Sequence, residues 1–423
     1  MMNLLNKIFS FSNKKDSKIS SFENLKQKKS IKKLFSSIEN YSENSEIRYV
    51  GGCIRKILNN ESIDDIDFAV NLKPKECINV LAKNNIKFYE TGIDHGTITA
   101  VIENEKFEIT SLRKDIKTDG RHAEVVYSKD WHEDASRRDF TINSIYSDLE
   151  GNLYDPYQGK NDIQNGKIQF IGDAEKRIRE DYLRILRYVR FFINYSKQPH
   201  EEKIKIIIKK NINGISNISS DRLLDEFKKI IKSSGFTRLF EDSFCLEIIS
   251  LIFPQFKNLK IFKKLNNFAK SKIVEIDYII LISLMLIDDT DNVDYFLFKY
   301  NLSKKDKKRI LFLKESFNKI NKDTFSEKNL WKIFYTNGKQ CLFDLIYFEI
   351  FRSKLANKKL IDLLAFFNDK EIPIFPIKAT HLIKNYNLSE GKMIGIKLKK
   401  IEEKWISNDF KISENEISQL LKN

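Results

Sequence analysis

Hydrophobic positions along the chain follow two different periods, and the change falls near residue 174. Before it, short runs of Val, Ile and aromatic residues bounded by turn signals predict strands at 47–50, 66–70, 97–103 and 106–112. Asn104-Glu105 predicts a tight hairpin turn between the last two, and residues 74–85 have helical spacing. From about residue 174 the spacing is helical almost throughout. The predicted fold is an α/β head, with a small mixed sheet and helices, followed by an all-α neck, body and tail.

Turn residues and composition divide the chain further. Pro254 marks one internal boundary, and the Pro373/Pro376 pair marks another. We therefore expect five segments: a basic, disordered tail (1–25), the α/β head (26–165), a helical neck (166–253), a helical body (254–372) and a helical tail (373–423).

The chain is strongly basic. Its 74 Lys and Arg residues against 59 Asp and Glu residues give a formal charge of +15 over 423 residues. Such an excess indicates a phosphate-rich partner such as nucleic acid, although an AT-rich genome that enriches Lys, Asn and Ile would give a similar composition. Basic runs such as 304–309 and 397–400 are then either solvated faces or phosphate contacts.

The spacing of the cysteines and the composition of residues 1–20 indicate the cellular compartment. The four cysteines are scattered without a CxxC pair, which argues against a zinc site or a disulfide framework and fits a reducing compartment. No apolar run reaches the length of a membrane span. Residues 1–20 are basic and contain Ser but no Arg, which favours a basic tail over an organelle-targeting peptide. We expect a cytoplasmic protein.

Acidic residues crowd the start of the strand at 66–70. Asp65 and Asp67 are two positions apart in "DDIDFAV", so on an extended chain their carboxylates point to the same side. Adjacent carboxylates bind hard cations such as Mg²⁺, which bridge to phosphates. Glu108, on the predicted neighbouring strand, is the candidate third carboxylate. The ordinary alternatives are a turn or capping role for the two aspartates and a solvated strand position for Glu108.

A glycine pair precedes these carboxylates. Gly51-Gly52 joins a predicted strand to a short helix, where backbone N–H groups can approach a phosphate closely and Arg55 lies one turn further on. A glycine pair alone indicates only a tight turn. Placed before a paired Asp-x-Asp, it indicates phosphoryl or nucleotidyl transfer from a nucleoside triphosphate.

Residues 174–191 predict one helix with a polar stripe beside an apolar one. Its apolar positions include Ile178, Tyr182 and Ile185, while Asp181 and Arg184 lie one turn apart on the polar stripe. A surface ion pair is the ordinary explanation. The functional one is that the pair inspects a base: Asp accepts from the amino group of cytosine or adenine, and Arg donates to the adjacent ring nitrogen. Uracil and guanine reverse that order and would be refused.

Several motifs in order carry a family resemblance. They are "GGCIR…DDIDFAV", "HGTITAVIENEKFEITSLRKD", "RRDFTINSIY", "DPYQGKNDI", "REDYLRILRYVRF" and "SSDRLLDEF", with a weaker similarity over 375–405. Together they resemble the class II tRNA nucleotidyltransferase and poly(A) polymerase family of the polymerase-β superfamily, from about residue 47 to 230.

The resemblance implies a CCA-adding enzyme that uses CTP, ATP and Mg²⁺ on tRNA 3′ ends without a nucleic-acid template. It implies that Asp65 and Asp67 hold two metal ions and that Asp181 and Arg184 select the base. It further implies that a set of residues holds the triphosphate and ribose or orders the selecting pair, namely Arg138, Asp139, Arg187 and Arg190. The helical angle points Arg190 away from Asp181. The head would carry the nucleotidyl transfer, the neck the nucleotide selection, and the tail tRNA contacts.

One departure and three alternatives accompany this interpretation. Lys56 stands where the family usually has Asp after the glycine motif, which predicts a looser Arg55 side chain. A poly(A) polymerase is less favoured, since residues 70–95 lack the arginine-rich run that follows the aspartates in such enzymes. Partial addition of CC or A stays open. A catalytically inactive tRNA-binding protein is the third alternative, and the presence of Asp65, Asp67, Asp181 and Arg184 together argues against it.

Overall fold

The computed structural model describes residues 22–118, 123–321 and 323–422. They form two compact units, divided between Ile252 and Phe253. The predicted basic tail lies largely outside the described residues, and the first described helix begins at Phe22. No helix among the described residues combines the length and apolar character needed to cross a bilayer.

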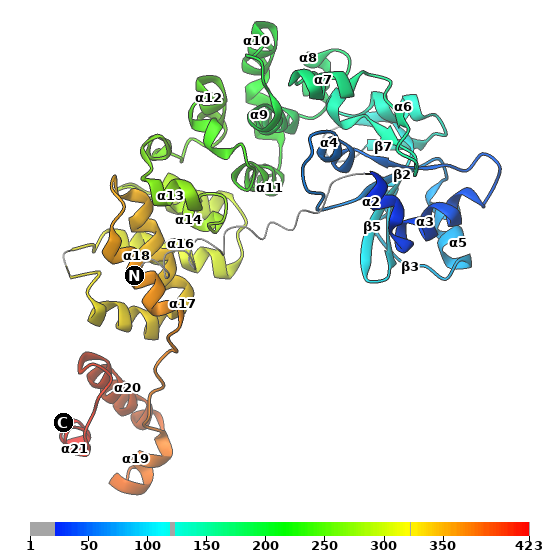
Figure 1. Cartoon of the computed structure of the whole chain (residues 1–423). Coiled ribbons are helices and arrows are strands. Elements are labelled where there is room, and N and C mark those ends of the chain that lie inside the picture. The colour runs from blue at the N-terminus through cyan, green and yellow to red at the C-terminus, as the bar shows by residue number, and fades with distance from the viewer. Residues whose placement is uncertain (1–21, 119–122, 322, 423) are drawn as a thin grey trace, which may run out of the picture. The chain divides into compact units, whose positions relative to one another are not determined.

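The first unit contains all the strands of the described chain (Figure 1). A mixed seven-stranded sheet has the order β3-β4-β5-β2-β1-β8-β9, and β6 and β7 form a separate hairpin. The strands are β1 (Ile47–Val50), β2 (Asp67–Val70), β3 (Lys87–Gly92), β4 (Thr97–Ile102), β5 (Glu105–Ser111), β6 (Arg113–Thr118), β7 (Ala123–Tyr127), β8 (Tyr146–Ser147) and β9 (Leu153–Tyr154).

Helices surround this sheet and continue beyond it. They are α2 (Phe22–Gln27), α3 (Lys29–Glu39), α4 (Gly52–Leu58), α5 (Pro74–Lys83), α6 (Trp131–Ser136), α7 (Gly159–Asn165), α8 (Ala174–Glu180), α9 (Leu183–Tyr195), α10 (Glu202–Asn211), α11 (Ser220–Ile231) and α12 (Ser243–Ile252).

The regular elements among the described residues of the second unit are all helices. Its helices are α13 (Asn267–Lys272), α14 (Tyr278–Leu286), α15 (Asn292–Lys299), α16 (Lys304–Phe317), α17 (Glu327–Arg352), α18 (Lys358–Asn368), α19 (Ala379–Tyr386), α20 (Lys392–Ser407) and α21 (Glu414–Lys422). The predicted order of an α/β head followed by helices is confirmed, whereas the finer division into neck, body and tail stays a prediction.

Aromatic packing fixes which face of β2 is buried. The Phe68 ring lies 5.7 Å from the Phe35 ring of α3, 5.1 Å from Tyr49 of β1 and 5.8 Å from Phe107 of β5. Side chains alternate along a strand, so Asp67 points to the opposite face from Phe68. The hydrophobic core beneath β2 therefore dictates the direction of the acidic side chain.

Two predictions of local structure need correction. The turn between β4 and β5 is formed by Glu103 and Asn104, both with positive φ (50° and 66°), as in a type I′ hairpin turn, and not by Asn104-Glu105. The predicted single helix over 174–191 is two helices, because Asp181 is extended (φ −154°, ψ 104°) and ends α8. Tyr182, predicted in one apolar stripe with Ile178, is only partly buried at this break.

Candidate active site

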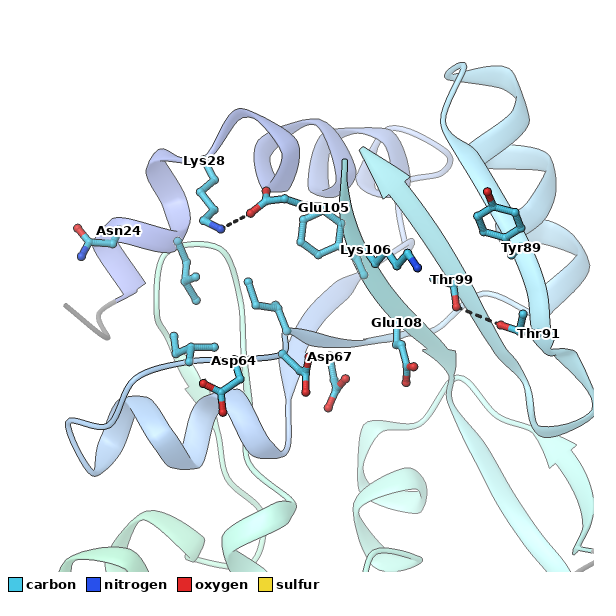
Figure 2. A pocket seen from close by; sticks show the side chains of 15 residues that line it. Asn24, Lys28, Asp64, Asp67, Tyr89, Thr91, Thr99, Glu105, Lys106 and Glu108 are labelled. Atoms are coloured by element: carbon cyan, nitrogen blue, oxygen red, sulfur yellow. Dashed lines mark hydrogen bonds and ion pairs between the residues drawn. The ribbon is translucent and has the colours of Figure 1, made fainter. Parts of the chain in front are cut away.

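Strand pairing places two of the three predicted carboxylates side by side. β2 and β5 are parallel neighbours, and Asp67 is the register partner of Glu108. Asp65 lies two residues before Asp67, on the chain entering β2. Figure 2 shows Asp67 and Glu108 reaching from adjacent strands toward the same space. All three line a cavity of about 1000 Å³.

Mutual repulsion perturbs this acidic cluster. Burial, Glu108 and Asp65 together raise the pKa of Asp67 from 3.8 to about 6, although Arg138 and Arg55 oppose the rise. Taking one oxygen from each, Asp65, Asp67 and Glu108 do not come within 4.8 Å of one another, whereas a nitrogen, an oxygen and a sulfur do so at a second described cluster considered below. Three carboxylates facing one space, one of them hard to ionise there, fit a site that a divalent cation would stabilise.

The turn before α4 has the conformation that the glycine pair predicted. Gly51 has φ +72° and ψ −118°, which an L-residue rarely adopts, and a Cβ at this position would lie 3.7 Å from Nη1 of Arg138. The guanidinium of Arg138 therefore passes beside this turn.

Arg55 is held firmly, contrary to the expectation from Lys56. It is buried, donates to Oδ1 of Asn143, and lies over the rings of Phe191 and Tyr195 at 4.9 and 5.0 Å. Lys56 instead pairs with Asp64 of the acidic motif. The replacement of Asp by Lys thus leaves Arg55 anchored by other partners.

A buried hydrogen-bond chain continues from Arg55. Asn143 donates to Oδ1 of Asp139 at 2.9 Å, and Arg187 donates to Oδ2 of Asp139 at 2.6 Å. Burial raises the pKa of Asp139, but Arg187 and Asn143 outweigh it and lower the pKa to about 2. Asp139 is therefore an ionised anchor that orients Arg187. Sequence reasoning assigned no role to Asn143, although it lies in the "RRDFTINSIY" motif.

Arg138 is oriented by a second buried carboxylate. Nη2 of Arg138 lies 3.0 Å from Asp134, which also accepts from Tyr146 at 2.7 Å and pairs with Arg137. Burial raises the pKa of Asp134, but the two arginines outweigh it and hold the pKa below its ordinary value.

One aromatic ring, that of Phe191, makes cation–π contacts with several guanidinium groups. Arg55, Arg187 and Arg190 lie 4.9, 5.6 and 4.2 Å from the centre of the Phe191 ring. Arg190 also pairs with Glu226, whose side chain is 2% exposed. Burial lowers the pKa of Arg190 and Glu226 opposes the change. The cation–π contacts allow three positive groups to share one region despite their repulsion.

Asp181 and Arg184 do not pair with each other. Asp181 accepts from the backbone N–H of Leu183 through Oδ1 (3.2 Å) and from Arg222 of α11 through Oδ2 (2.7 Å). Arg184 donates from Nη1 to Glu180 at 2.9 Å and to the carbonyl of Arg177 at 2.6 Å. The simple surface ion pair is therefore absent, and sequence reasoning missed Glu180 and Arg222 as partners.

Known protein families and solved structures that resemble this chain are nucleotide-adding enzymes of the same kind of fold. Residues 47–169 match the family described as "Poly A polymerase head domain", and residues 201–260 match "Probable RNA and SrmB- binding site of polymerase A". The solved CCA-adding enzyme of Bacillus stearothermophilus in complex with CTP is 19% identical, with a TM-score of 0.72 over 94% of this chain and 98% of that one. At this identity the likeness establishes the fold.

Proteins with related sequences identify the family of the chain. The chain is 32% identical over 405 residues to the human "CCA tRNA nucleotidyltransferase 1, mitochondrial", covering 93% of this chain and 89% of the relative. It is 30% identical over 294 residues to the CCA-adding enzyme of Lactobacillus johnsonii, covering 68% and 71%. With this extent of similarity, and with the acidic sheet edge and arginine cluster in place, the chain belongs to the CCA-adding enzyme family of tRNA nucleotidyltransferases.

Proposed function

We propose that the chain adds C, C and A from CTP and ATP to the 3′ end of tRNA without a nucleic-acid template. The observation that carries the proposal is that Asp67 and Glu108 are register partners on adjacent strands. Beside them lie arginines whose orientation is fixed by buried carboxylates. The family membership established above supports the same reaction.

Asp65 and Asp67 would hold the metal ions, and Glu108 would complete the acidic face. When bound, divalent cations, here proposed as Mg²⁺, make a terminal 3′-hydroxyl more acidic and offset charge on the leaving pyrophosphate. The raised pKa of Asp67 supports this role, because a cation removes the repulsion from Glu108 and Asp65 that opposes ionisation.

The arginine cluster would bind the triphosphate. Arg55, Arg138, Arg187 and Arg190 supply planar donors suited to phosphate oxygens. Gly51 and Gly52 would let the backbone approach the same anion. Asp139 would then act through Arg187, by fixing its orientation, and no protein nucleophile is required because positioning and charge stabilisation lower the barrier.

Asp181 and Arg184 would select the base. Each oxygen of Asp181 can accept a second hydrogen bond, so the carboxylate can receive the amino group of cytosine or adenine while Arg222 holds it. Both hydrogen bonds of Arg184 described above use Nη1, and we propose that Nε and Nη2 serve the base. Uracil and guanine would bring an oxygen to Asp181 and an N–H to Arg184, which leaves buried groups unsatisfied.

We further assign nucleotidyl transfer to residues 26–165, selection to 166–253 and tRNA contacts to 373–423. The cytoplasm stays our predicted location; the mammalian relatives are named as mitochondrial.

A primer-extension gel tests the proposal. The substrate is tRNA lacking its last three nucleotides, with Mg²⁺ and each nucleotide alone, then with CTP and ATP together. We expect two additions from CTP, three from the mixture, and none with Asp67→Asn. A long ladder from ATP alone would identify a poly(A) polymerase, addition that stops at CC or requires a preformed CC end would identify a partial enzyme, and binding without extension would leave a tRNA-binding protein.

A further inference from the structure

Three side chains with metal-binding atoms converge away from the acidic sheet edge. His200 lies between α9 and α10, Asp242 immediately precedes α12, and Cys245 lies in its first turn. Nε2 of His200 is 3.1 Å from both carboxylate oxygens of Asp242 and 3.7 Å from Sγ of Cys245. The ligand atoms all lie within 4.8 Å of one another.

These distances resemble the edges of a zinc tetrahedron. Zinc bonds of about 2.0–2.1 Å to nitrogen, 2.0–2.2 Å to oxygen and 2.3 Å to sulfur give edges of about 3.3 Å between N and O and about 3.5 Å between N and S. A mixed set of imidazole, carboxylate and thiolate suits Zn²⁺ better than Mg²⁺, which prefers oxygen alone. We propose that His200, Asp242 and Cys245 form a Zn²⁺ site, separate from the acidic cluster.

The imidazole is already oriented for this role. The hydroxyl of Tyr188 lies 2.9 Å from Nδ1 of His200, which leaves Nε2 directed at Asp242 and Cys245. The Phe192 ring stacks on His200 with centroids 3.5 Å apart, and the Phe244 ring meets it edge-on at 4.7 Å. A partner on the second ring nitrogen and a fixed ring plane are regular features of metal-ligating histidines.

Burial and charge also fit the proposed ion. Cys245 is fully buried and the His200 side chain is 8% exposed, whereas Asp242 is 27% exposed and opens the cluster to a water as fourth ligand. One thiolate and one carboxylate neutralise the double charge of Zn²⁺, which removes much of the cost of burying it. Asp242 also caps α12 by accepting from the Cys245 N–H at 2.7 Å, and without a metal the Cys245 thiol lies within hydrogen-bond distance of His200.

The site would link the base-selecting helix to its neighbour. Tyr188 belongs to α9, the helix that carries Arg184 and Arg187, and both Asp242 and Cys245 are at the start of α12. Bound Zn²⁺ would therefore fasten the end of α9 to α12 and stabilise the first unit.

The test uses the full-length protein, stripped of metal by a chelator and supplied with excess Mg²⁺ to occupy hard-ligand sites. Co²⁺ is titrated as a spectroscopic substitute for Zn²⁺. We expect one equivalent of Co²⁺ with a thiolate charge-transfer band, which one equivalent of Zn²⁺ removes. Zn²⁺ at 100 times its dissociation constant should raise the unfolding temperature by about 5 °C.

Substitutions test whether the bound metal lies at this site and not at another thiol or at the acidic cluster. Cys245→Ser should lose the charge-transfer band, and Tyr188→Phe should weaken Zn²⁺ binding about tenfold without abolishing it. Cys77→Ser removes another buried thiol, and Asp65→Asn alters the acidic cluster; both should keep the band. Absence of the band in the wild-type protein, or its persistence in Cys245→Ser, would overturn the proposal. The wild-type spectrum decides the question even if Cys245→Ser does not fold.

Discussion

Asp67 offers a quantitative test of the acidic cluster, because its ionisation in the metal-free protein opposes folding. Its pKa rises from the ordinary value of 3.8 to about 6, through burial and then through repulsion from Glu108 and Asp65. At about 1.36 kcal/mol for each pKa unit, the ionised group costs about 3 kcal/mol of folding free energy. Asp67→Asn removes this cost while keeping the shape of the side chain.

The sign of the pH dependence follows from the raised pKa. Below pH 3.8 the carboxyl is protonated in both folded and unfolded chains, so wild type and Asp67→Asn should have similar stability. As the pH rises from 3.8 to about 6, the wild-type protein loses stability that the variant keeps. At pH 8 without metal, the variant should therefore unfold about 6 °C higher.

Calorimetry in a chelating buffer at pH 4, 6 and 8 measures this difference. Mg²⁺ should then stabilise the wild type more than the variant, and the variant should not extend tRNA. Asp64→Asn is the matched control, since Asp64 is 70% exposed and pairs with Lys56; it should change the unfolding temperature little at any pH. An Asp67→Asn variant no more stable than wild type at pH 8 would refute the argument.

Three further substitutions test the surrounding network. Arg222→Gln removes the ion pair that holds Asp181, and discrimination of CTP against UTP in single-nucleotide extension should fall about tenfold. Gly51→Ala places a Cβ at φ +72°, which should cost about 1–3 kcal/mol of stability and raise KM for both nucleotides. Glu226→Gln leaves the partly buried Arg190 without its carboxylate, and denaturant unfolding should show a loss of about 3 kcal/mol.

Each substitution has a control of the same chemical type. Lys228→Gln lies on the same helix as Arg222 and should leave nucleotide choice unchanged. Gly172→Ala also has positive φ, +74°, with no atom within 4 Å of the added Cβ, so it should lose stability without altering KM. Asp225→Asn is exposed and should be near neutral. The argued roles would be contradicted by equal changes of nucleotide choice in the Arg222 pair, of KM in the Gly51 pair, or of stability in the Glu226 pair.

The acidic sheet edge was accessible to sequence reasoning because it depends on local rules. Alternation along an extended chain predicts Asp65 and Asp67 on one side, and a hairpin that pairs through β5 brings Glu108 to the cavity that both aspartates line. The hairpin turn itself was misplaced by one residue, since Glu103 adopts a positive φ that propensity rules assign to Asn or Gly.

Contacts between segments that are distant in sequence could not be predicted from the sequence. The helical period runs through Asp181 without interruption, yet Asp181 is extended, and its side chain accepts from the Leu183 N–H and from Arg222 of another helix. The convergence of His200 with Cys245 has no spacing signature either, because only the fold brings their side-chain atoms together. Both features depend on residues that become neighbours only in the folded structure.

The parallel register between β2 and β5 also has a consequence for folding kinetics. Asp67 and Glu108 become neighbours only when the segment that separates β2 from β5 in sequence, with α5, β3 and β4, has been closed into a loop. Closing such a long loop is slow, and its product forms late. A cation that requires both carboxylates should therefore stabilise the native state more than the folding transition state. Mg²⁺ should slow unfolding while leaving the rate of folding nearly unchanged.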